Sequence, residues 1–88
     1  MALASRHEAT VDELINLMDR MDAIYRNANS ETPEYEDLRR RVREIGEALN
    51  QVGGKEMMLR VHARVTHKRR DLNRYLDWLW NMIGKWRG

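Results

Sequence analysis

Apolar side chains recur at alternating steps of three and four residues along most of the chain, and this spacing restricts its fold more than any other feature. Such a period places the side chains on one face of an α-helix, whereas a half-buried strand needs strict alternation, which is absent. The clearest run lies between residues 35 and 52, and its members are Tyr35, Leu38, Val42, Ile45, Leu49 and Val52. The sequence therefore predicts an all-α protein.

Turn-forming residues divide this pattern into segments. Thr32 and Pro33 are typical of a helix start, because a threonine hydroxyl accepts from an unpaired backbone N–H and proline lacks the N–H that the first turn leaves unused. The Gly53-Gly54 pair is typical of a helix end. No such signal separates the last two segments, which form either one helix or two. We expect helices at about 6–28, 33–52, 55–67 and 71–86, within one domain that covers residues 1–88.

The short connections favour antiparallel packing of successive helices. The apolar arc of the first helix spans about 180°, which is wider than the stripe of about 100° that covers a single core. A chain of 88 residues buries a limited core, so this surplus needs a second neighbour. The expected fold is a three- to four-helix antiparallel bundle that is completed by self-association.

The segment from residue 75 to residue 86 has the highest density of aromatic side chains. Trp78 and Trp80 project about 100° to either side of Leu79 on an ideal helix, so the apolar arc is again wide. The two rings either cap the edges of the bundle, or line a homo-oligomer interface, or form a groove for a foreign partner or ligand. The residues that we expect on a self-association interface are Leu17, Ile24, Trp78, Trp80, Met82 and Trp86.

The net charge of +2 conceals two halves of opposite sign. Residues 1–52 hold 7 basic and 11 acidic side chains, a balance of −4, whereas residues 53–88 hold 9 basic and 3 acidic ones, a balance of +6. The basic half contains a stripe along the third helix that is suited to a polyanion: Arg60, Arg64, Lys68, Arg69 and Arg70. The competing interpretation pairs this stripe with acidic side chains of the first helix, namely Glu8, Asp12, Glu13, Asp19 and Asp22.

Sequence signals for catalysis and metal binding are weak. His62 and His67 are five residues apart, which is the wrong spacing for two ligands on one helical face, so His62 is interpreted as a hydrogen-bonded residue at the core edge. Asp22 falls within the apolar arc of its helix, where a carboxylate is either paired with an arginine of the basic half or placed at the bundle edge. We expect no catalytic residue, no metal site and no cofactor.

The absence of cysteine excludes disulfides and thiolate metal clusters, and no apolar run approaches the length of a membrane span. The apolar stretch at the start of the sequence is interrupted by a charged residue too soon to form the core of a signal peptide. We therefore expect a cytoplasmic protein that does not associate with a membrane.

The C-terminal half also resembles a group of small bacterial helical proteins. The likeness rests on Gly53-Gly54, Met57, Val61 and the closing segment from Trp80 to Gly88, with its Trp-x-x-Ile-Gly-x-Trp pattern. That group often has Asp-Gly after the first Trp, where this chain has Asn81-Met82. The resemblance implies a bacterial origin and an all-helical fold, and it implies no activity, cofactor or partner.

These observations together predict a small non-catalytic helical interaction or assembly protein that forms a homo-oligomer, most simply a homodimer. A nucleic-acid-binding regulator that uses the basic stripe is the alternative.

Overall fold

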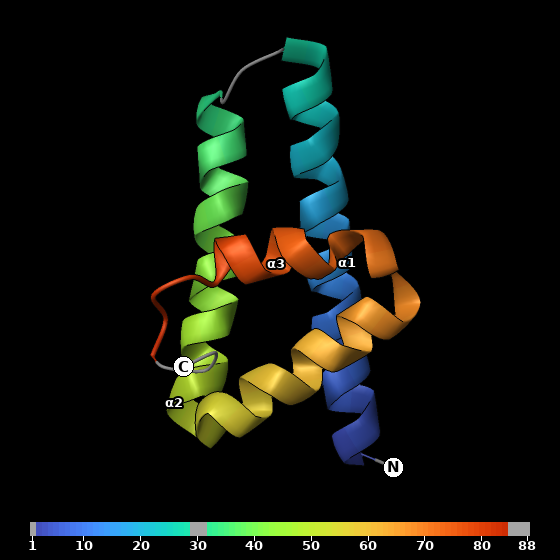
Figure 1. Cartoon of the computed structure of the whole chain (residues 1–88), viewed down its shortest axis with the longest axis vertical. Coiled ribbons are helices and arrows are strands. Elements are labelled where there is room, and N and C mark those ends of the chain that lie inside the picture. Colours follow the sequence, from blue (N-terminus) through green and yellow to red (C-terminus); the bar gives the residue numbers. More distant parts are fainter. Residues whose placement is uncertain (1, 29–31, 85–88) are drawn as a thin grey trace.

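The structure is a computed structural model that describes the backbone of residues 2–28 and 32–84, and side chains from His7 onward within those ranges. It is all-α within these ranges: the elements are α1 (Ala2–Ala28), α2 (Pro33–Lys68), a 3-10 turn η1 (Arg70–Leu72) and α3 (Asn73–Leu79). The first half of α2 runs back beside α1, the second half turns obliquely past the other end of α1, and η1 and α3 cross both helices at mid-height (Figure 1).

The start of α2 follows the predicted capping chemistry. The hydroxyl of Thr32 accepts a hydrogen bond from the backbone N–H of Tyr35 at 3.2 Å, and Pro33 occupies the first turn. In contrast, α1 begins at Ala2, earlier than the expected start near residue 6.

The glycine pair divides α2 into two helical stretches, as the sequence predicted, and the chain bends there. Gly54 has φ 67° and ψ −161°, values that lie outside the helical region and that side chains with a Cβ rarely adopt, while regular helix continues on both sides. The two halves of α2 therefore meet at an angle, so that α1 is contacted along two directions (Figure 1). This bend explains much of the wide apolar arc of α1.

The predicted last helix is shorter than expected and is separate from α2. Arg69 ends the helical conformation of α2, since its φ of −139° and ψ of 87° are not helical. The regular helix of α3 ends at Leu79, well before the predicted residue 86. Beyond it, Met82 has a left-handed φ of 73°. The guanidinium of Arg43 donates to the carbonyl oxygens of Leu79 at 2.8 Å and Asn81 at 3.0 Å, and it thereby stabilises the end of α3.

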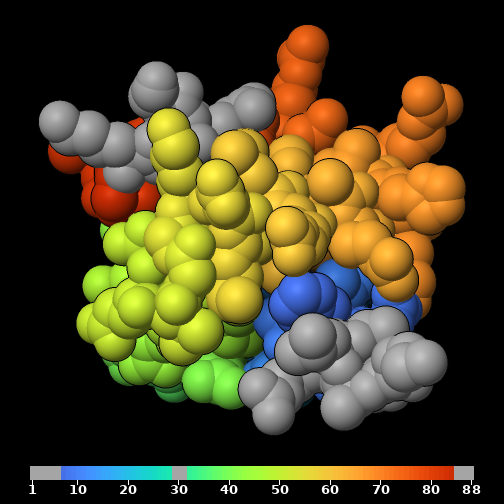
Figure 2. Space-filling view, turned by 90° about the horizontal axis from the view of Figure 1, so that it is seen from below, coloured from blue at the N-terminus to red at the C-terminus, as the bar shows by residue number. Residues whose placement is uncertain are grey.

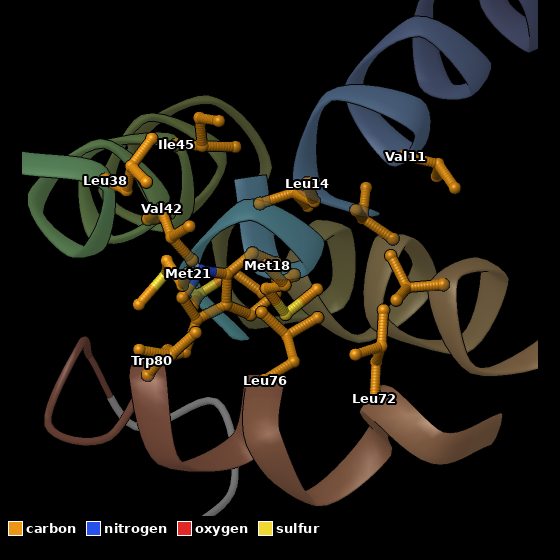
Figure 3. Packing of buried hydrophobic residues seen from close by; sticks show 14 of the residues in the cluster. Val11, Leu14, Met18, Met21, Leu38, Val42, Ile45, Leu72, Leu76 and Trp80 are labelled. Carbon is orange, nitrogen blue, oxygen red and sulfur yellow. Dashed lines mark hydrogen bonds between the residues drawn. The ribbon is translucent and has the colours of Figure 1, made fainter. Parts of the chain in front are cut away.

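The hydrophobic core lies between α1, both halves of α2 and the η1–α3 segment (Figure 3). The seam predicted from residue 35 onward is buried as far as Ile45, Leu49 is half-buried, and Val52 is exposed against expectation. The core comprises Val11, Leu14, Met18, Met21, Tyr35, Leu38, Val42, Ile45, Met58, Val61, Val65, Leu72, Leu76, Leu79, Trp80 and Ile83.

Trp80 is the largest fully buried side chain, with 0% of its surface exposed. Its indole lies directly on the backbone of α2 at Gly46, and its Nε1–H donates to the carbonyl oxygen of Val42 at 3.0 Å. A Cβ at position 46 would stand 2.6 Å from that Nε1, so only glycine permits this approach. The Gly46–Trp80 contact fixes the position of the chain just after α3.

Candidate functional site

A groove of about 520 Å³ opens between the C-terminal end of α1, the start of α2 and the η1–α3 segment. We call it the aromatic groove, because four of its lining side chains are aromatic. Its lining residues are Asp19, Asp22, Tyr25, Arg26, Tyr35, Arg69, Asp71, Leu72, Tyr75 and Trp78.

The four rings belong to three helices and form a connected set. Tyr25 of α1 lies 6.1 Å from Tyr35 of α2 between ring centroids, and Tyr75 stacks on Trp78 within α3 at 6.2 Å with an interplanar angle of 7°. The hydroxyl oxygens of Tyr35 and Tyr75 are 3.1 Å apart and share a hydrogen bond, which joins the two pairs. The guanidinium of Arg39 covers Trp78 at 4.9 Å from the ring centroid.

Two of these four rings are half-exposed to solvent, although each of the four contacts another ring of the set. Tyr25 is 48% exposed and Trp78 is 49% exposed, whereas Tyr35 is buried. Aromatic rings that present an apolar face and a polar tip to solvent are enriched at protein interfaces. The groove therefore offers two half-exposed rings, one from α1 and one from α3, to an incoming molecule.

The rim of the aromatic groove carries charges of both signs that are paired with one another. Arg69 donates to both carboxylate oxygens of Asp19 at 2.8 and 3.0 Å and to both of Asp71 at 3.1 and 3.0 Å. These hydrogen bonds, that to Asp71 first, raise the pKa of Arg69 above its ordinary value. The same hydrogen bond from Arg69 lowers the pKa of Asp71.

Asp22 also lies on this rim, and it is exposed. Its carboxylate pairs with Arg26, one helical turn further along α1, at 3.0 Å. The expected arginine partner from the basic half is wrong, and the placement at the edge of the fold is right, because Asp22 is exposed beside core-facing Met21 and Ile24.

The five residues of the predicted interface that the structure describes do not share one surface. Leu17 and Ile24 are half-buried against the core, and Trp78 lines the aromatic groove. Trp80 lies inside the fold, since the chain leaves the helical path after Leu79 and turns the indole onto Gly46. Met82 is 85% exposed in the turn that follows α3. Trp86 lies outside the described residues.

The aromatic groove cannot be predicted from the apolar periodicity alone. Tyr25 and Tyr35 both fall on the apolar seams of their helices, so the sequence assigns both rings to the core. The only local signal was the residue type, because a tyrosine hydroxyl at a seam position needs a hydrogen-bond partner or solvent.

The basic stripe is largely engaged by the acidic side of α1, which is the competing interpretation of the charge asymmetry. Figure 2 shows the second half of α2, in yellow and orange, lying against the N-terminal part of α1, in blue. Glu8 binds both Arg64 and Lys68, the latter at 2.6 Å, and Asp12 binds Lys68 at 3.1 Å. Together with the Asp19–Arg69 pair, these contacts remove three of the five predicted cations from a common polyanion surface.

Other predicted partners are arranged differently. Glu13 pairs with Arg41 of the first half of α2 at 3.0 Å and so does not reach the basic half. Among the described residues, no ion pair involves Arg60 or Arg70, and both side chains are exposed.

His62 is the one buried polar residue of the described core, as its sequence interpretation expected. Its Nε2 lies 2.8 Å from Oδ1 of Asp77 and 3.3 Å from the carbonyl oxygen of Asn73. The imidazole thereby connects α2 to α3. Within the described ranges, no three His, Asp or Glu side chains are arranged to hold a metal ion.

Comparison with protein-family models, with curated proteins and with solved structures finds no match for this chain. No described helix has the length and apolar character that crossing a bilayer requires. The functional conclusions below therefore depend on the geometry of the chain itself.

Proposed function

We propose that the protein is a small non-catalytic helical interaction module that self-associates through the aromatic groove. The observation that carries the proposal is the pair of half-exposed rings, Tyr25 and Trp78, which α1 and α3 present to one groove. These are the two segments whose wide apolar arcs favoured self-association in the sequence.

The charges on the rim favour a second copy of the chain as the occupant. A two-fold interface uses the same patch on both subunits, so the patch must be complementary to itself. Three carboxylates and two guanidinium groups line the aromatic groove and are paired within the chain, so a second copy meets a rim of mixed sign and not one of a single charge. A single-sign rim would repel a second copy.

The expected interface is small, because only two large apolar side chains of the groove are open to solvent. Interfaces below about 1,200 Å² of total buried area are typically weak or transient. We therefore expect a homodimer with a dissociation constant in the micromolar range, which corresponds to about −8 kcal/mol.

Sedimentation velocity of the full chain between about 0.1 µM and about 100 µM, about three decades that bracket that value, tests the proposal. Trp78→Glu places a charge on the groove wall and should weaken the dimer at least tenfold, which is about 1.4 kcal/mol. Val52→Glu is the matched control, since Val52 is an equally apolar, 77% exposed side chain that does not line the groove.

Three results would contradict the proposal: a wild-type chain that stays monomeric at the highest concentration, a dimer that Trp78→Glu leaves intact, or an equal loss caused by Val52→Glu. Tyr25→Ser alters the opposite wall without touching α3, and it should also weaken the dimer. It keeps the test decisive if the Trp78 variant is unstable.

A further inference from the structure

A second groove lies on a different face of the molecule, between the last turns of α2 and the η1–α3 segment. Its volume is about 650 Å³, and it is shallow and open. We call it the donor groove. Its lining residues are His62, Ala63, Thr66, His67, Arg70 and Asn73.

The charge of the donor groove sets it apart from the rest of the basic stripe. None of its six lining residues is acidic, although the chain contains 14 carboxylate side chains. On the neighbouring face of α2, Arg64 and Lys68 are held by Glu8 and Asp12 of α1. Arg70, by contrast, forms no ion pair within the described part of the chain, so its guanidinium keeps its capacity to bind an anion.

The polar groups in this groove are mainly hydrogen-bond donors. A guanidinium has five N–H donors in a fork that matches two oxygens of an oxyanion, and the amide of Asn73 and the ring of His67 add N–H groups. The nearby carboxylate of Asp77 does not line the groove, and it contacts His62 at Nε2.

One hydroxyl in the wall lacks a partner. Oγ1 of Thr66 is buried, and no hydrogen bond to it exists within the described structure. A buried hydroxyl without a partner is unfavourable, and most such groups in proteins are satisfied. The oxygen has almost no accessible surface as it stands, so the side chain must turn about its Cα–Cβ bond before the hydroxyl can donate to a ligand oxygen beside Arg70.

We propose that the donor groove is a binding site for a tetrahedral oxyanion of the phosphate class, with Arg70 as the charged anchor and Thr66, His67 and Asn73 as hydrogen-bond donors. This site is independent of self-association, since no residue of the donor groove lines the aromatic groove. Inorganic phosphate and the phosphate of a small monoester share this chemistry.

Titration of the ¹⁵N-labelled full chain with inorganic phosphate, at ionic strength matched with chloride, tests the site by NMR. We expect saturable shifts that are confined to amides of residues 62–73. Arg70→Gln removes a charge-assisted hydrogen bond and should weaken binding about tenfold. Thr66→Val keeps the shape of the side chain and should weaken it severalfold.

Arg60→Gln is the matched control, because Arg60 is an exposed arginine of α2 that, like Arg70, has no described ion pair, and it lies outside the donor groove. A parallel titration with a nucleoside monophosphate compares a monoester with the free ion, and equal or tighter binding at residues 62–73 supports the site. A proportional, non-saturating response would overturn the proposal. So would an equal loss in the Arg60 and Arg70 variants, which would indicate general attraction of anions to the basic stripe.

Discussion

The contact between Gly46 and Trp80 predicts that Gly46→Ala, which adds a single methyl group, is strongly destabilising. Alanine in a helix interior is normally more stable than glycine by about 0.5–1 kcal/mol. Here the added Cβ would stand 2.6, 2.8 and 2.9 Å from three atoms of a rigid, fully buried indole. Ordinary carbon contacts lie at about 3.5–4.0 Å, so ring and helix must separate by about 1 Å.

That separation has two costs. Overpacking of a core typically costs about 1–3 kcal/mol. A displaced indole also loses its 3.0 Å hydrogen bond to the carbonyl of Val42, which contributes about 0.5–1.5 kcal/mol. After the gain in helix propensity is subtracted, we expect Gly46→Ala to lower the free energy of unfolding by about 2 kcal/mol. For a domain of this size, that corresponds to a melting temperature roughly 10 °C lower.

A double-mutant cycle measured by urea denaturation, with circular dichroism as the probe, isolates the cause. In a Trp80→Leu background the indole is gone, and Gly46→Ala should then be neutral or stabilising by up to about 1 kcal/mol. The reasoning is refuted if Gly46→Ala stabilises the wild-type chain, or if it destabilises both backgrounds equally.

Two further predictions concern the rim of the aromatic groove and the turn after α3. The pKa of Asp71 is lowered by Arg69, so this carboxylate stabilises the fold above its ordinary pKa of about 3.9, and the contribution is lost as the pH falls through the lower folded value. Melting temperatures from pH 7 down to pH 2 should therefore fall less steeply for Asp71→Asn than for the wild type, and an identical acid dependence would contradict the role of this pair. Met82 has a left-handed φ, which costs a residue with a Cβ about 1–2 kcal/mol. Met82→Gly should therefore leave the melting temperature unchanged or raise it, whereas Asn81→Gly should lower it. A melting temperature that falls for Met82→Gly and not for Asn81→Gly would refute the strain at Met82.

The sequence predicts best what depends on local chemistry. The seam from Tyr35 to Ile45 is buried as its spacing requires, because a helix must turn its apolar face toward the core. Thr32 caps α2 through its own hydroxyl, an interaction within four residues. The pairing of opposite charges between α1 and the second half of α2 also follows from the unequal distribution of charge along the chain.

The errors arise where distant segments decide the structure. Helical projection places Trp80 at the edge of the last helix, but α3 ends at Leu79, where Arg43 from α2 binds the final carbonyl oxygens. The burial of Trp80 then depends on the missing side chain of Gly46, 34 positions earlier in the sequence. No local period contains that information.

The candidate site shows the same limit. Trp78 is half-exposed, but Tyr25 and Tyr35, which line the groove with it, come from two other helices and approach it only after α2 bends at Gly54. The angle of that bend depends on two backbone dihedrals of one glycine, and neither is specified by the hydrophobic pattern. A groove shared by three elements therefore emerges only from the assembled fold.

Light scattering of the wild-type chain across a dilution series measures self-association itself through the mass of the protein in solution. Self-association through the aromatic groove predicts a mass that rises with concentration from the monomer value of 10.5 kDa toward twice that value, and Trp78→Glu should move this rise to a concentration at least about tenfold higher. A mass that stays at the monomer value throughout the series would contradict the account.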